Sequence, residues 1–235
     1  ADGPDVDFVY RIFNADGQEV EQCGNGARCF ARFVRDQGLT SKSTIRVRTK
    51  SGVISPTIHA DGSVTVDMGP PHFDLQQIGF DVSGLAHRRE GQADLWQMQP
   101  PNAEPFWITA VSMGNPHVVQ WVEHLDSHPV GPIGAWCESH PRFHFRVNVS
   151  FVQQHSAQQI SIRVFERGAG ETLACGTGAC AAVVAGILRG SLAPSVPVEV
   201  RARGGRLKII WSGQASDHVM MTGPAEPVFD GVMQL

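Results

Sequence analysis

One short motif occurs twice, about half a chain length apart, and this repeat constrains the fold more than any other feature of the sequence. The motif Cys-Gly-x-Gly-Ala begins at Cys23 and again at Cys175, an offset of 152 residues (175 minus 23) in a chain of 235. Two copies are too few for a solenoid, so repetition at this distance indicates two related lobes. We therefore expect two lobes with one motif each, and motifs that face each other.

Each motif is expected to open a helix. After the first motif, Phe30, Phe33 and Val34 recur at helical spacing, and Gly38 is placed like the glycine that follows a helix end. After the second motif, residues 179–188 are apolar on all sides and are followed by an Arg-Gly pair, as expected for a centrally buried helix. Both motif cysteines would then lie at helix N-termini.

Most of the remaining sequence predicts strands and loops. Paired prolines at 70–71 and 100–101 predict loops or joints, and we place the lobe boundary near Pro71. Alternating apolar residues predict strands over 45–49, 58–66, 160–165 and 198–211, with turns at Asp61-Gly62 and Gly204-Gly205.

Composition and charge exclude several classes of protein. The formal net charge is −4 with no basic stripe, which argues against a nucleic-acid or anionic-membrane partner. The longest apolar run, 179–188, is too short to span a bilayer, and no secretory leader opens the chain. Five cysteines lack the regular spacing of a disulfide framework. We expect a soluble cytoplasmic protein with free thiols.

The chemistry follows from a thiol placed at a helix N-terminus. Unpaired backbone N–H groups and the positive end of the helix dipole lower the pKa of such a thiol, so it can act as a base. The neighbouring glycines let a substrate carboxylate approach the same N–H groups. Two such ends suit inversion of the carbon next to a carboxylate: one thiolate removes the proton, and a thiol on the opposite face returns one.

Cofactor and metal alternatives are weaker. The chain has only three lysines, Lys42, Lys50 and Lys208, and none lies in a glycine-rich motif, so a pyridoxal Schiff base is not expected. The spacings C-x5-C and C-x4-C differ from the C-x2-C of zinc knuckles. The two common glycine-rich phosphate-binding motifs, G-x-G-x-x-G and G-x-x-x-x-G-K-S/T, are both absent from the sequence. We expect no cofactor and no metal.

The other cysteines have a structural interpretation. A cysteine in a glycine-rich turn before a helix is usually a small buried residue, and only the paired context favours catalysis for the two motif cysteines. Cys29 and Cys180 lie further into their helices, where core packing is expected, and Cys137 has no motif around it. We assign all three a structural role.

The sequence resembles the diaminopimelate epimerases in motifs that span nearly the whole chain. These are Phe-Asn-Ala-Asp-Gly at 13–17, Gln-Cys-Gly-Asn-Gly-Ala-Arg-Cys at 22–29, Ser-Met-Gly-Asn-Pro-His at 112–117, Arg-Val-Asn at 146–148, Glu-Arg-Gly-Ala-Gly-Glu-Thr followed by Ala-Cys-Gly-Thr-Gly within 166–178, and Met-Thr-Gly-Pro at 221–224.

The resemblance implies an isomerase that interconverts LL- and meso-diaminopimelate in the bacterial route to lysine and peptidoglycan. It implies an α/β (α+β) fold of two similar lobes, each a curved, mostly antiparallel sheet around a central helix, with the active site in the cleft between them. The lobes would be residues 1–71 plus 224–235, and residues 72–223.

The resemblance also implies the site residues. Cys23 and Cys175 would be the two bases, with His117 and Glu166 beside them, where their charge biases which thiol is ionised. The reacting-end carboxylate would be bound by backbone N–H groups, and the far end by amides and a guanidinium suited to a zwitterion. The carboxylate-binding residues would be Gly24, Asn25, Gly176 and Thr177, and the far-end residues Asn14, Asn115, Asn148 and Arg167.

Two departures from the family pattern qualify this reading. Family members normally begin with a leading segment of a few dozen residues that is not in this sequence, so the first lobe would be an incomplete sheet with an exposed edge. Such an edge tends to pair with another chain, and a homodimer is the assembly we consider. In addition, His144-Phe145 replaces the expected Pro-Glu, which we interpret as a loop change that could shift Asn148.

Two other functions stay open on the sequence. The first is another cofactor-independent racemase of the same fold, acting on proline or hydroxyproline. The second is a non-catalytic binding protein. The dibasic substrate is favoured because Arg167 and three asparagines are available for a second amino-acid group.

Overall fold

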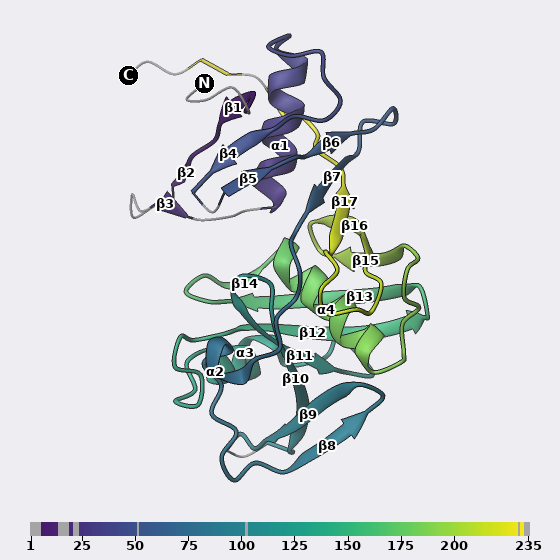
Figure 1. Ribbon diagram of the computed structural model, residues 1–235. Helices are drawn as coiled ribbons and strands as arrows, with labels where there is room; N and C mark the ends of the chain where they lie inside the picture. The colour runs from purple at the N-terminus through teal and green to yellow at the C-terminus, as the bar shows by residue number, and fades with distance from the viewer. Residues whose placement is uncertain are drawn as a thin grey trace. The chain divides into compact units, whose positions relative to one another are not determined.

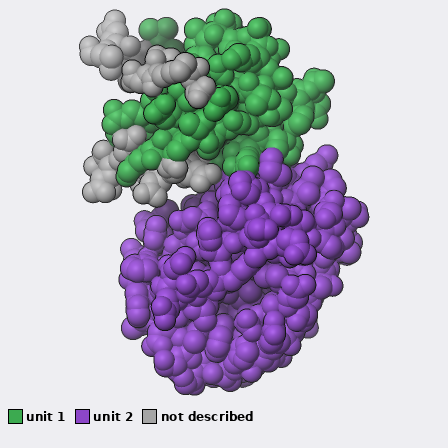
Figure 2. Space-filling model, in the orientation of Figure 1, with its two compact units in different colours: residues 1–67, 222–235 green, residues 68–221 purple. Residues whose placement is uncertain are grey.

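The computed structural model describes residues 6–13, 19–20, 24–50, 52–101, 103–229 and 231–232 (Figure 1). The chain forms two compact units, coloured separately in Figure 2. Unit 1 contains residues 1–67 and 222–235, and unit 2 contains residues 68–221. The motif residues Cys23 and Asn14 lie outside the described residues.

Unit 1 packs one amphipathic helix on short strands. Helix α1 (Gly24–Asp36) contacts β6 and β7, and its buried residues meet Ile45, Val47 and Val64 in a small core. Strand β1 pairs in parallel with β4, and β4 pairs antiparallel with β5. The strands are β1 (Phe8–Val9), β2 (Ile12–Phe13), β3 (Glu19–Val20), β4 (Val47–Thr49), β5 (Gly52–Ile54), β6 (Thr57–Ile58) and β7 (Val64–Asp67).

Helix α1 ends as the sequence predicts. Gly38 has φ of +68°, in the left-handed region that glycine adopts without steric cost. Its N–H donates to the Arg35 carbonyl, and the Leu39 N–H donates to the Val34 carbonyl, both at 3.0 Å. These two bonds form a Schellman motif and satisfy carbonyls that the helix leaves open.

One cysteine assignment in α1 is wrong. Cys29 is exposed and does not pack in a core. The buried stripe of α1 runs through Gly24, Ala27, Arg28, Ala31 and Val34 at spacings of three and four. Cys29 falls just beside this stripe, and about 100° of rotation per residue turns it toward solvent. Cys180 is fully buried, as predicted, and Cys137 is fully buried as well.

Unit 2 is built on a mixed, mostly antiparallel sheet. The strand order is β16-β15-β13-β12-β11-β10-β9-β8, with β14 added to β13. The pairs β11–β12 and β13–β15 are parallel, and the other neighbours on this path are antiparallel. The strands are β8 (His87–Glu90), β9 (Ala93–Met98), β10 (Phe106–Ser112), β11 (Pro116–Trp121), β12 (Asn148–Ser156), β13 (Gln159–Glu166), β14 (Gly170–Thr172), β15 (Val198–Ala202), β16 (Gly205–Ile210) and β17 (Met220–Gly223), the last of which crosses the boundary between the units.

Helices cover both faces of this sheet, as β12 shows. Helix α3 (Val130–Glu138) shares a hydrophobic core with Phe151, which includes the buried Cys137. The neighbouring Ser150 points the other way, because side chains alternate along a strand, and it lies against Gly178 of α4. A short helix, α2 (Leu75–Ile78), contacts β10.

Helix α4 (Gly176–Leu188) is the centre of unit 2. It contacts β10, β11, β12, β13 and β16, and all its residues from Gly178 to Ile187 are buried. Arg189 caps its end, and Gly190 follows with φ of +77°. The predicted central helix is therefore confirmed, and so is the sheet-rich α+β fold. Within the described residues, no helix is long and apolar enough to cross a membrane.

Candidate active site

Cys175 is the N-cap residue of α4. Its backbone is extended, with φ of −125° and ψ of 113°, and its carbonyl accepts the first helical bond, from Ala179 at 3.0 Å. The N–H groups of the first helical turn have no partner within a helix and point beyond its end. The predicted position of this cysteine is confirmed. Its side chain is only 6% exposed.

The expected charge state of Cys175 is wrong for this structure. Burial, together with the smaller effect of the neighbouring Glu166 carboxylate, raises the pKa of the thiol to about 12, although a bond to Thr177 acts in the opposite direction. A helix end favours the thiolate, but removing a charge from water opposes it more strongly here. Cys175 therefore holds its proton at neutral pH and is suited to be the acid of a pair.

A hydrogen bond fixes the carboxylate beside this thiol. Glu166 ends β13, and Thr172 lies on β14, which pairs antiparallel with β13. The Thr172 hydroxyl donates to Glu166 Oε1. This bond holds the Glu166 carboxylate in place beside the Cys175 thiol, whose pKa it helps to raise.

A chain of polar contacts runs from Cys175 to His117. Thr177 Oγ1 lies 3.5 Å from Cys175 Sγ, and Asn115 Nδ2 donates to Thr177 Oγ1 at 3.4 Å. His117 Nε2 lies 3.0 Å from Asn115 Oδ1. Because an amide oxygen only accepts, this contact requires His117 to carry its proton on Nε2.

His117 is neutral, which corrects the expectation that its charge biases the thiols. The side chain is completely buried, and burial lowers its pKa to about 3, with Arg167 adding to the effect. Its other nitrogen, Nδ1, is buried without a hydrogen-bond partner among the described residues. His117 can therefore influence Cys175 through hydrogen bonding, but not through charge.

This neutral histidine should make the folded state sensitive to acid. In the folded state the pKa of His117 lies below its ordinary 6.5. The contribution of the neutral side chain to the free energy of unfolding is therefore complete above pH 6.5 and declines as pH falls toward 3. Unfolding free energies from urea titrations between pH 7 and 4 should fall more steeply in the wild type than in His117→Gln, by up to about 1.4 kcal/mol per pH unit. Parallel curves would contradict the buried, neutral assignment.

Asn148 ties the loop that carries Arg167 to the sheet. Its Oδ1 accepts from the Arg167 backbone N–H, and its Nδ2 donates to the Pro116 carbonyl, both at 3.0 Å. The guanidinium of Arg167 donates to the carbonyl of Phe145 at 3.0 Å. At the position where His144-Phe145 departs from the family pattern, the contact with Arg167 is therefore made by a backbone carbonyl. The side-chain amide of Asn148 is already hydrogen-bonded within the protein.

Glu138 hydrogen-bonds to the loop that carries Arg167, and the sequence alone did not identify it. Glu138, at the end of α3, is 3% exposed and accepts from the Gly168 N–H at 2.9 Å. It also pairs with Arg146, whose NH2 lies 2.6 Å from Glu138 Oε2. No motif surrounds Glu138, and it lies 30 residues before Gly168 in sequence, so only the folded chain reveals the contact.

The first motif lies in unit 1 and is described in part. Gly24 is buried and Asn25 is partly buried, both in the first turn of α1. Arg28, three residues on, donates to the carbonyl of Pro224 at 3.1 Å and joins the helix to the C-terminal segment. Cys23 itself is outside the described residues.

Solved structures with a similar fold include epimerases, racemases and phenazine biosynthesis proteins. A hydroxyproline epimerase from Agrobacterium vitis matches with a TM-score of 0.64 at 17% identity, over 92% of this chain and 67% of that one. A probable proline racemase from Agrobacterium radiobacter matches with a TM-score of 0.67 at 16% identity, over 95% and 71%. The chain therefore shares the fold of these proteins.

Closer relatives identify the family. The family model for diaminopimelate epimerase matches residues 2–73 and 109–228. A diaminopimelate epimerase from Herminiimonas arsenicoxydans is 56% identical over 230 residues, which cover 98% of this chain and 80% of that protein. One from Burkholderia thailandensis is 54% identical over 232 residues, covering 98% and 79%. This chain belongs to the diaminopimelate epimerase family.

Proposed function

We propose that this chain epimerises diaminopimelate at an α carbon by direct proton transfer between two thiols, Cys23 and Cys175. Cys175 carries the proposal, because a buried thiol with a pKa of about 12 at a helix N-terminus is suited to deliver a proton. Family membership supports the substrate.

In the proposed reaction, the Cys23 thiolate removes the α proton from one face of the substrate, and the pair of electrons stays on carbon. The thiol of Cys175 then gives its proton to the opposite face and becomes a thiolate. The substrate leaves with inverted configuration, and the reverse reaction uses the two thiols in exchanged roles. Two groups on opposite faces are needed because a single group would return the proton to the face it came from.

Carboxylate recognition is assigned to the start of α4. The N–H groups of Gly176 and Thr177 belong to its first turn, where a helix binds anions well. Binding there would hold the α carbon beside Cys175 and stabilise the charge that develops when the proton leaves. For the far end, Arg167 is exposed and has five N–H donors, one of which already bonds to Phe145.

The mechanism needs both thiols in reduced form. Disulfides are rare in reducing compartments, where thiols persist. We therefore propose that the protein works in the cytoplasm.

The direct test follows the α proton of the substrate. LL-Diaminopimelate is incubated with the reduced protein in deuterium oxide without added pyridoxal phosphate, and is monitored by proton NMR and chiral chromatography. We expect meso product with deuterium at the α carbon. Proline and hydroxyproline serve as alternative substrates. Exchange on either of these with none on diaminopimelate would contradict the proposal.

The carboxylate of Glu166 should control the reactivity of Cys175. In Glu166→Gln the neighbouring negative charge is lost, so the pKa of Cys175 should fall and its thiolate fraction at pH 8 should rise. Each unit of pKa corresponds to about tenfold in thiolate, and the thiolate is the form that alkylates. Mass spectrometry of iodoacetamide-treated protein should show faster labelling of Cys175.

Glu171→Gln is the matched control for this change. Glu171 lies in the same hairpin, but its carboxylate bonds Arg163 at 2.7 Å and pairs with Arg203 instead of acting on the thiol. Labelling of Cys175 should therefore keep its wild-type rate in this variant. Equal rates in the two variants would remove Glu166 from the proposed mechanism.

A further inference from the structure

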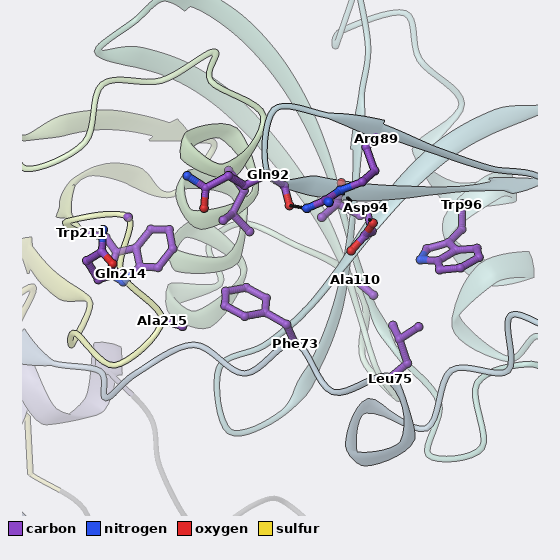
Figure 3. Close-up of a pocket in the computed structure, with 13 residues that line it drawn as sticks. Phe73, Leu75, Arg89, Gln92, Asp94, Trp96, Ala110, Trp211, Gln214 and Ala215 are labelled. Atoms are coloured by element: carbon purple, nitrogen blue, oxygen red, sulfur yellow. Dashed lines mark hydrogen bonds and ion pairs between the residues drawn. The ribbon is translucent and has the colours of Figure 1, made fainter.

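Unit 2 contains a cavity of about 460 Å³ that the proposed reaction does not use (Figure 3). It lies at the far end of α4 from Cys175, since Leu188, the last residue of that helix, lines it. A helix of 13 residues is about 20 Å long at about 1.5 Å per residue, so the cavity is well separated from the catalytic thiol.

Aromatic rings line the cavity from more than one element. Phe73 and Trp211 lie with ring centroids 6.4 Å apart, and Trp96 lines the cavity from β9. Figure 3 shows the Phe73 ring between the Trp211 side and the Asp94 side of the space. Aromatic walls of this kind favour a planar apolar group, which gains from ring contacts as well as from burial.

The charged part of the lining comes from a single hairpin. Arg89 and Asp94 lie opposite each other on β8 and β9, with Arg89 Nε 3.4 Å from Asp94 Oδ1, and Gln92 lies at the turn between them. Both charged side chains are more than half exposed. Asp94 Oδ1 also lies 2.9 Å from His87 Nε2, and Arg89 also donates to the Gln92 carbonyl at 3.5 Å. Exposed contacts of this kind are weak, so each partner can accept a ligand group without a large loss.

These groups match an amino acid. A guanidinium binds a carboxylate through two parallel hydrogen bonds, and a carboxylate such as Asp94 binds an ammonium group. An α-amino acid carries both groups on one carbon, as close together as Arg89 and Asp94 are. The volume is within the range of ordinary small-molecule pockets.

The charged wall also lies outside the family match. The β8–β9 hairpin falls within residues 74–108, which the diaminopimelate epimerase model does not match. The cavity is thus built partly from residues other than those that define the family. We propose that it is a second binding site, which takes a free α-amino acid with an aromatic side chain.

The test uses the chain's tryptophans as reporters and L-phenylalanine as the probe. The protein has five tryptophans, and two of them, Trp96 and Trp211, line the cavity. In protein labelled with 5-fluorotryptophan, with signals assigned from single Trp→Phe variants, fluorine NMR should show saturable shifts for these two. The signals of Trp107, Trp121 and Trp136 should stay in place.

Ligand analogues and matched variants decide the chemistry. 3-Phenylpropionate lacks the ammonium group and phenethylamine lacks the carboxylate, so each should bind about tenfold more weakly or worse. Arg89→Ala should weaken phenylalanine binding to a similar degree. Arg88→Ala should not, because Arg88 lies over the Trp107 ring at 4.3 Å and pairs with Glu90.

Three results would overturn the proposal: unchanged Trp96 and Trp211 signals at millimolar phenylalanine, equal binding of 3-phenylpropionate, or equal loss in the two arginine variants. None of these readouts depends on turnover. A failure here therefore leaves the epimerase proposal intact, and failure of the epimerase assay leaves this one intact.

Discussion

Replacement of Cys175 by alanine should abolish most epimerisation, with turnover lowered by a factor on the order of 100 to 10,000, the usual contribution of a positioned acid or base. Alanine at this position cannot give or accept a proton on its face of the substrate. Conversion of LL- to meso-diaminopimelate, measured by chiral chromatography, should fall accordingly, in both directions.

Cys180→Ala is the matched control, because it removes a thiol from the same helix one turn further on. Cys180 is fully buried, and its helix contacts the same sheet. This variant should keep near-wild-type turnover at a small cost in stability. If both variants lost activity equally, the loss would reflect damage to α4 and the two-thiol mechanism would lose its main support.

Phe151→Ala should strongly destabilise unit 2, by about 3–5 kcal/mol in the free energy of unfolding. Phe151 is completely buried in β12, within the core that the sheet shares with α3. Its removal leaves a cavity that the surrounding close-packed side chains can fill only in part. Because Asn148 begins the same strand, the change should also loosen the support of the Arg167 loop.

Tryptophan fluorescence in urea measures this change in unit 2 alone, because all five tryptophans of the chain lie within residues 68–221. Phe145→Ala makes the same chemical change at a side chain that is 57% exposed, and it should shift stability by about 0.5 kcal/mol or less. A similar loss in both variants would mean that the Phe151 core does not govern the stability of unit 2.

Local patterns in the sequence were sufficient to predict the elements that carry the motifs. The apolar run that becomes α4, the cysteine at its start and the glycine that ends α1 all depend on neighbours a few residues away. Hairpins at Asp61-Gly62 and Gly204-Gly205 were predictable for the same reason, since Gly62 and Gly205 both have positive φ. The family resemblance added the residues that surround the motifs.

The properties that depend on distant parts of the chain were not predictable. Cys29 lies outside the core because the face of α1 that is buried depends on strands more than ten residues away. Glu138 supports the Arg167 loop from another helix, and the cavity beside Trp211 joins a hairpin, a loop and the end of α4.

The charge states at the candidate site show most clearly which properties follow from the sequence and which depend on the tertiary structure. By itself, the sequence determined that a thiol stands at a helix N-terminus, with a histidine and a glutamate in motifs of the same family. Only the tertiary structure decided that this thiol and His117 are both neutral at pH 7. The reason is physical: the free energy of a charge depends on how much water surrounds it, and packing between residues far apart in sequence removes that water.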